Sequence, residues 1–134
     1  MYKRQLAESA YSAQANAAVN EVLVEQVRSV AAGGHTVVVD ATFLDHALRS
    51  RLAAEVQGAL IRFLGIWLHA PLPLLEVRIN ARYTDASDAT VAILRRAAAR
   101  DPGALDWLAV DASDCSVALA AIRQAIATIT QPPG

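Results

Sequence analysis

Hydrophobic residues in this chain recur at two spacings, one typical of helices and one typical of buried strands. Apolar positions three or four residues apart predict helices over 6–32, 46–57, 72–82 and 88–99, and a last helix that follows Ser113 and runs to about residue 130. Short runs of β-branched and aromatic residues predict strands over 36–40, 61–69 and 107–112. Because helices and strands alternate, the chain is predicted to form an α/β layer with parallel strands.

The ends of the predicted helices carry typical boundary residues. Gly33–Gly34 follows the first helix, where a C-terminal cap is expected. Pro71 and Pro73 stand where the helix over 72–82 begins, and proline is tolerated in a first turn. The predicted N-cap residues are Asp45, Ser87 and Ser113.

The first predicted strand ends in a carboxylate. Val37–Val39 is a β-branched run of the kind that forms a buried strand, and it leads directly into Asp40 and then Thr42. Open parallel sheets bind their ligands at the carboxyl ends of the strands. Asp40 is therefore a candidate for ligand contact. The alternative is that its side chain caps its own turn.

Two arginines form a second candidate site. Arg78 and Arg82 are four residues apart, so they share one face of the predicted helix. A loop with three further polar residues follows them: Asp85, Ser87 and Asp88. Paired guanidinium groups suit a polyphosphate, because each offers a planar fork of donors to oxyanions. The alternative is a solvated helix face followed by an N-capped helix.

Composition narrows the class of protein. A chain of 134 residues with 54% hydrophobic and 19% charged residues is at most one domain and can bury a core. Its apolar stretches are interrupted too often to span a bilayer, and no secretory signal is visible. The single cysteine, Cys115, fits a reducing compartment. With a net charge of −1 and no basic cluster, the sequence predicts a cytoplasmic protein that binds neither membranes nor nucleic acid.

Other catalytic chemistries receive little support. The sequence has three histidines, His35, His46 and His69, and they lack the spacing of metal ligands. No metal site is therefore predicted. Cys115 shares a helical face with Leu119, Ile122, Ile126 and Ile129, which predicts a small core residue. Trp67 and Trp107 fall in predicted strands and are interpreted as core residues.

Three segments, taken in order, resemble a P-loop kinase-like domain: "GGHTVVVDATFLDHALRSRLA", "FLGIWLHAPLPLLEVRINARYTDASDATVAIL" and "LDWLAVDAS". The similar proteins are small AAA-type predicted kinases related to gluconate kinase, zeta toxins and chloramphenicol phosphotransferase. The resemblance runs from about residue 11 to 125. It implies a partial parallel sheet of about three strands with flanking helices, and a lid region at about 72–99.

The resemblance also implies roles for particular residues. Asp40 matches the strand-end acid that faces the phosphoryl acceptor or the magnesium shell, with Thr42 and Arg49 on the acceptor side. Arg78 and Arg82 match lid arginines that close over the nucleotide phosphates. The remaining positions implied to lie near the nucleotide are Asp85, Ser87, Asp88, Asp111 and Ser113. The intact parent would use ATP and Mg²⁺ and phosphorylate a small hydroxyl-bearing acceptor.

One part of the family pattern is missing from the sequence. No segment reads Gly-x-x-x-x-Gly-Lys-Ser/Thr, the loop whose backbone N–H groups, lysine and hydroxyl hold phosphate and magnesium. The first strand and phosphate-binding loop are therefore expected to be absent, which makes this chain a carboxyl-terminal fragment that binds no nucleotide tightly and is inactive alone. The alternative is a non-catalytic nucleotide-fold remnant or partner-binding module.

The resemblance sets expectations for boundaries and partners. Residues 1–5, "MYKRQ", resemble the translation of a sequencing adapter and include the only lysine; residues 6–130 would be the partial domain and 131–134 a tail. In similar proteins an aminoglycoside-phosphotransferase-like domain often precedes this one. The strand expected to be absent lies between 36–40 and 61–68 in the family. Its loss would expose two apolar edges, so self-association is expected.

Overall fold

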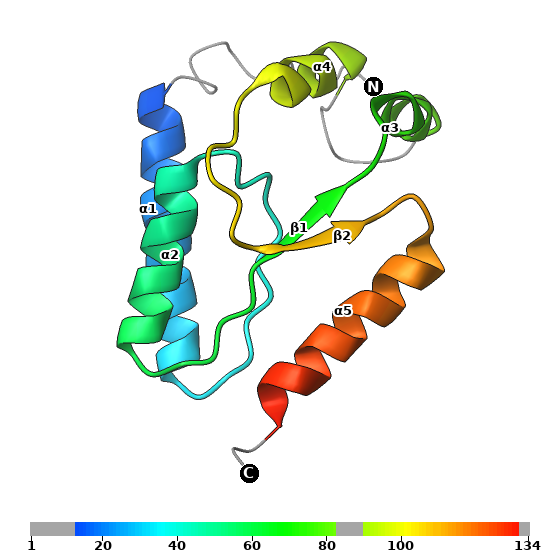
Figure 1. Cartoon of the computed structure of the whole chain (residues 1–134). Helices are drawn as coiled ribbons and strands as arrows, with labels where there is room; N and C mark the ends of the chain where they lie inside the picture. Colours follow the sequence, from blue (N-terminus) through cyan, green and yellow to red (C-terminus); the bar gives the residue numbers. More distant parts are fainter. Residues whose placement is uncertain (1–12, 83–89, 132–134) are drawn as a thin grey trace. The chain divides into compact units, whose positions relative to one another are not determined.

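The computed structural model describes residues 13–82 and 90–131. Figure 1 shows the order of the elements along the chain: α1, α2, β1, α3, α4, β2 and α5. The chain divides into a first unit, Met1–Phe43 with Ala47–Ile61, and a second unit, Leu44–His46 with Arg62–Gly134. The first unit is helical and the second contains the sheet, so the α/β class predicted from the sequence is confirmed.

The first unit is built from two helices, α1 (Ala13–Ala32) and α2 (His46–Gly58). Its core consists of buried apolar side chains from both helices and from the segment between them: Val24, Val27, Phe43, Leu48, Leu52 and Val56. The apolar stripe predicted for the helix over 46–57 is thus the face that α2 buries. An exposed ion pair between Arg51 and Glu21 joins the two helices, with Nη2 of Arg51 3.0 Å from Oε2 of Glu21.

Helix α1 ends as the sequence predicts. Gly34 has a φ of 83°, a left-handed conformation that glycine adopts without a steric penalty. Its N–H donates to the Ala31 carbonyl at 3.0 Å, and the N–H of Gly33 donates to the Val30 carbonyl at 3.2 Å. Two of the last carbonyl groups of the helix are therefore satisfied.

Residues 36–40 do not form the predicted strand. Their backbone is not paired with any segment of residues 13–82 and 90–131, and the sheet of the described chain has two strands rather than about three. Burial nevertheless alternates along this segment, with Val37 and Val39 half-buried and Val38 exposed. The period of two that the sequence encodes is present, but a strand also needs a hydrogen-bonded neighbour.

The sheet of the second unit consists of β1 (Ile66–His69) and β2 (Leu108–Asp111), which run parallel. In their register Ile66 pairs with Leu108 and His69 pairs with Asp111. The strand predicted over 107–112 is confirmed, whereas the one predicted over 61–69 begins only at Ile66. Because β2 is the only strand paired with β1 in the described residues, β1 extends about as far as β2 does.

A close approach fixes the backbone just before β1. The carbonyl of Gly65 accepts a hydrogen bond from the N–H of Leu108 at 3.0 Å. A Cβ atom at Gly65 would lie 2.4 Å from Cγ and Cδ2 of Trp107, so only glycine fits against this indole. Trp107 also contacts the ring of Phe63 edge-on, with the centroids 5.8 Å apart. Trp67 and Trp107 are both half-buried, in keeping with their interpretation as packing residues.

Helices α3 (Leu72–Asn80) and α4 (Val91–Ala99) pack on each other. Pro71 and Pro73 stand at the beginning of α3, as predicted. The N-cap of α4 is Thr90, whose hydroxyl accepts from the N–H of Ile93 at 3.3 Å. The predicted cap, Ser87, lies outside the described residues, and the prediction of a helix over 88–99 is corrected to a start at Val91.

Two predictions about α5 (Cys115–Thr130) are wrong. Its N-cap is Asp114 rather than Ser113, because Oδ1 of Asp114 accepts from the N–H groups of Ser116 and Val117 at 2.8 and 3.1 Å. Cys115 is exposed rather than part of a core. The face of α5 with the lowest exposure is rotated from the predicted one and consists of Ala118, Ile122, Ala125 and Ile129.

Within residues 13–82 and 90–131, no helix combines the length and the apolar character that crossing a membrane requires.

Candidate strand-end site

The carboxyl ends of β1 and β2 bring together a histidine and a carboxylate. His69 and Asp111 are register partners and the last residues of their strands. Just beyond them the N–H of Ala112 donates to the carbonyl of His69 at 2.7 Å, which keeps the two chain exits adjacent. Parallel strands therefore present both residues at the edge of the sheet where ligands bind in open α/β folds.

Arg78 connects α3 to the loop that follows β2. Its Nη1 atom donates to the carbonyl of Ala112 and its Nη2 atom to the carbonyl of Ser113, each at 2.8 Å. The planar guanidinium thus bridges two successive peptide groups. Because the guanidinium group of Arg78 binds backbone carbonyls, its direct effect is to position the β2–α5 loop.

Replacing Arg78 with alanine should lower the free energy of unfolding of the second unit by about 1–2 kcal/mol. Two carbonyl oxygens lose charged donors, but both bonds are partly open to water, which reduces the effect. Thermal unfolding followed by circular dichroism measures this change. Arg78→Lys should recover only part of the loss, because an ammonium group cannot reproduce the planar fork.

Arg96→Ala is the matched control, since Arg96 is exposed on α4 and should be replaceable with little effect. Equal melting temperatures for the Arg78→Ala and Arg96→Ala chains would contradict the positioning role of Arg78.

The β2–α5 loop also holds itself in shape through Asp111. Oδ1 of Asp111 accepts from the N–H of Ser113 at 2.8 Å. Hydrogen bonds from the side chain and the backbone of Ser113 lower the pKa of Asp111, and the nearby His69 and Arg78 contribute in the same direction. Asp111 is therefore a carboxylate at neutral pH, and its position is fixed by the residue two places ahead.

A cavity of about 290 Å³ lies over these strand ends and is called the strand-end cavity here. Its lining consists of Leu68, His69, Ala70, Leu75, Arg78, Ile79, Arg82, Leu94 and Ala112. Aliphatic side chains form most of the wall, and Arg78, Arg82 and His69 supply the polar groups. Apolar walls with a few convergent polar groups are typical of small-molecule sites. The arginines favour a ligand that carries negative charge.

The walls of the strand-end cavity come from separate elements that an ion pair ties together. Nε of Arg95 on α4 lies 2.7 Å from Oε1 of Glu76 on α3. This contact lowers the pKa of Glu76 through the hydrogen bond from Arg95. It holds α4, which contributes Leu94, against α3, which contributes Leu75 and Ile79.

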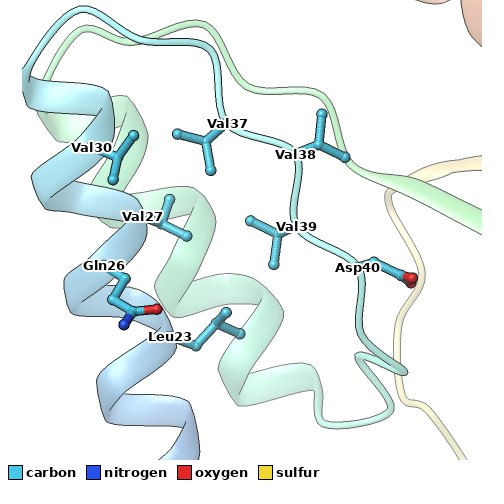
Figure 2. A pocket seen from close by; sticks show the side chains of 8 residues that line it. All are labelled: Leu23, Gln26, Val27, Val30, Val37, Val38, Val39 and Asp40. Carbon is cyan, nitrogen blue, oxygen red and sulfur yellow. The ribbon is translucent and has the colours of Figure 1, made fainter. Parts of the chain in front are cut away.

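The first unit carries the other predicted acid, Asp40. Figure 2 shows Val37 and Val39 directed toward α1, while Val38 and Asp40 point away from it. Asp40 and Thr42 are both exposed. Within residues 13–82 and 90–131 the Asp40 carboxylate makes no hydrogen bond and no ion pair, so the structure gives no support to the alternative in which it caps its own turn.

Arg49, expected on the acceptor side, is a packing residue in this structure. Its side chain is buried, with a relative exposure of 1%, and its Nη1 atom donates to the carbonyl of Phe43 at 2.6 Å. Phe43 has a φ of 47°, an unfavourable conformation for a bulky residue, and Arg49 holds the chain there. This burial argues against direct contact between Arg49 and a dissolved acceptor.

Comparison with protein-family models adds a decisive finding: a model described as an AAA domain matches residues 1–101. This range is more than half of the 134-residue chain. The chain belongs to the AAA-domain family. Searches of curated proteins and of solved structures found no significant match.

The AAA-domain match supports a nucleotide-binding, P-loop NTPase-like character for the chain. Its range includes Asp40, Thr42 and Arg49, and it also includes residues 1–5, the segment "MYKRQ" that resembles an adapter translation. Asp111 and Ser113 lie beyond the matched range, although the structure places them beside Arg78. The β2–α5 segment, which lies beyond the matched residues, is thus connected to the site by structure rather than by the family match.

The second unit brings together four of the residues predicted for the site: Arg78, Arg82, Asp111 and Ser113. Asp40, Thr42 and Arg49 belong to the first unit. Asp85, Ser87 and Asp88 lie outside the described residues. Among residues 13–82 and 90–131, no group of three or more histidine, cysteine or acidic side chains is arranged to hold a metal ion.

His69 was not among the site residues predicted from the sequence of this AAA domain. The histidine was treated as an isolated residue, yet it ends β1 as Asp111 ends β2. Aligning the ends of the two predicted parallel strands would have identified it, because residues that end neighbouring parallel strands share one edge of the sheet.

Proposed function

We propose that this chain is part of an ATP-dependent kinase-like P-loop domain that transfers a phosphoryl group to a small hydroxyl-bearing acceptor. The observation that carries the proposal is the strand-end cavity, whose lining includes Arg82 and also His69, the last residue of β1. Ligands of open parallel sheets bind at this edge. The AAA-domain match supports a nucleotide as that ligand.

In this proposal three side chains have separate roles. Arg82 lines the cavity and would stabilise negative charge on a bound phosphate. Arg78 would hold the β2–α5 loop, and with it Asp111 and Ser113, against α3. Asp40 would orient or deprotonate the acceptor hydroxyl, a role that suits an exposed carboxylate with no partner in residues 13–82 and 90–131.

The fit of ATP and Mg²⁺ to these residues is partial. Mg²⁺ usually binds through one or two carboxylates together with substrate phosphates and water, and Asp40 is the carboxylate that the sequence resemblance assigns to it. The MgATP complex would supply the transferable phosphoryl group. Among the described residues the cationic lining of the strand-end cavity suits its phosphates, but the sequence offers no glycine-rich loop with a lysine to cradle them.

We expect this chain alone to show no ATPase or kinase turnover, because the phosphate-binding loop and its lysine are missing from the sequence. Release of labelled phosphate from ATP, compared with a heat-killed sample, measures this. Turnover above that background that disappears in an Arg78→Ala/Arg82→Ala chain would overturn the expectation.

A gain-of-function experiment tests the proposed function itself. A strand-loop-helix unit with the sequence Gly-x-x-x-x-Gly-Lys-Ser/Thr would be joined ahead of residue 13, and phosphorylation of a panel of small alcohols would be measured. The proposal expects turnover that falls in the Arg82→Ala chain and persists in the Arg123→Ala chain, whose exposed arginine lies on α5. A folded fusion that binds no ATP would contradict it.

One observation favours the second candidate, a non-catalytic module with the same fold. The sequence resemblance implies that Arg78 contacts phosphates. In the structure, however, its guanidinium group donates to two backbone carbonyls. A purely structural role for this arginine is what a binding module would show. In the fusion experiment such a module would fold and remain inactive.

A further inference from the structure

A bulky residue with a left-handed backbone lies close behind Asp40. Phe43 has a φ of 47°, although this conformation brings the Cβ atom of any residue other than glycine close to the following carbonyl oxygen. Such residues persist only where the surrounding structure holds them in place, and they gather at functional sites. Phe43 ends the segment over residues 40–43, called the acid loop here, which carries both Asp40 and Thr42.

Two anchors hold Phe43 in this conformation. Its side chain is 8% exposed and belongs to the apolar core of the first unit. Its carbonyl accepts a hydrogen bond from Nη1 of Arg49 at 2.6 Å. Arg49 lies in the first turn of α2, next to Leu48, which the same core buries. Because Phe43 and Arg49 both belong to the first unit, these anchors are properties of that unit alone.

The burial of Arg49 indicates what its guanidinium group does. Its relative exposure is 1%, and burying a charged group costs free energy that an apolar side chain of similar size would not cost. What an apolar residue lacks is a planar fork of donors that can fix the direction of a carbonyl group. The hydrogen bond to Phe43, rather than the packing of the side chain, therefore distinguishes Arg49 from an apolar residue at this place.

We propose that Arg49 is a positioning residue, which holds the acid loop in one conformation through the Phe43 carbonyl and thereby fixes the direction of Asp40. The Asp40 side chain points away from α1 (Figure 2), and within residues 13–82 and 90–131 it makes no hydrogen bond or ion pair. Its direction therefore depends on the backbone that carries it. The use of this contact in catalysis rests on the proposed function, in which a misplacement of about 1 Å can cost about 10²-fold in rate.

Backbone relaxation measured by nuclear magnetic resonance tests the contact in the chain itself, without catalysis. The amide groups of residues 41–43 should have order parameters of about 0.85 in the unsubstituted chain and below about 0.6 in Arg49→Met. Methionine keeps an unbranched side chain but has no donor. Arg51→Met is the matched control, because Arg51 is exposed on the same helix and bonds to Glu21. Its order parameters should equal those of the unsubstituted chain.

Arg49→Lys provides a milder variant for the case in which Arg49→Met does not fold. Lysine keeps a cationic donor but lacks the planar fork, so the order parameters of residues 41–43 should lie between those of the other two chains. Order parameters that stay at the unsubstituted value in a folded Arg49→Met chain, or in Arg49→Lys where Arg49→Met does not fold, would overturn the proposal.

Kinetics in the fusion with the phosphate-binding unit test the use of the contact. Arg49→Met should lower kcat about 10–100-fold and leave the KM for ATP and for the acceptor nearly unchanged, whereas Arg51→Met should alter neither. A raised KM for the acceptor with an unchanged kcat would overturn the positioning role in favour of direct contact. A lower melting temperature with a normal kcat would overturn it in favour of a purely structural role. A fusion without turnover would contradict the proposed function, and the order parameters would still decide whether Arg49 holds the acid loop.

Discussion

Replacing Gly65 with alanine should lower the free energy of unfolding of the second unit by about 2–3 kcal/mol, the upper part of the usual range for an overpacked site. The added methyl group would lie 2.4–2.5 Å from Cγ, Cδ1 and Cδ2 of Trp107. These atoms are at the base of the indole, so a rotation of its far edge cannot relieve the overlap. Thermal unfolding should show a melting temperature lower by roughly 10 °C or more.

Gly58→Ala is the matched control for this prediction. Gly58 ends α2, and a Cβ atom there would meet no atom within 4 Å. The substitution should be neutral or slightly stabilising, because alanine reduces the conformational entropy of the unfolded chain. If both variants melt at the same temperature, the close contact between Gly65 and Trp107 does not exist in solution.

In the fusion that carries a phosphate-binding loop, replacing Asp40 with asparagine should slow the proposed phosphoryl transfer about 10²–10⁴-fold, the usual scale for loss of a general base. Asparagine keeps the shape of the side chain but removes its charge and its ability to accept a proton. Affinity for ATP should change little, because arginines and the phosphate loop would hold the nucleotide. Stability should also change little, since the carboxylate has no partner among the described residues.

Turnover, nucleotide affinity and melting should therefore be measured together for Asp40→Asn. Asp106→Asn serves as the control, because this exposed acid precedes β2 and has no assigned role. Near-normal turnover in a stably folded Asp40→Asn enzyme would end the catalytic interpretation. A loss of stability of about 1 kcal/mol with normal turnover would instead indicate a turn cap.

The helices were the most predictable part of the fold. The stripe of Leu48, Leu52 and Val56 identified α2 and its buried face, and Gly33–Gly34 identified the end of α1, since both depend on neighbouring residues. Strands depend on partners distant in sequence. The run over 36–40 has strand periodicity but no neighbour in the described chain, and β1 is shorter than its apolar run because β2 is short.

The sequence named four residues that the second unit brings together, Arg78, Arg82, Asp111 and Ser113, but it did not predict their contacts. The four-residue spacing of Arg78 and Arg82 predicted one shared helix face, but α3 ends at Asn80 and Arg82 lies beyond it. Both residues nevertheless line the strand-end cavity. The hydrogen-bond acceptors of Arg78 were not predictable. The Ala112 carbonyl is 34 residues away in the sequence, and any backbone carbonyl can accept a hydrogen bond from a guanidinium group. His69 was identified as a candidate site residue only from the register of β1 and β2.

The exposure of Cys115 offers a practical route to observing this site. It is the only cysteine of the chain, so a thiol-reactive dye would attach at a single position without further engineering. Cys115 begins α5, two residues after the Ser113 carbonyl that Arg78 holds. A fluorophore at this position would therefore report directly on the β2–α5 loop. Its emission and anisotropy would show whether a nucleotide draws the guanidinium of Arg78 away from the backbone.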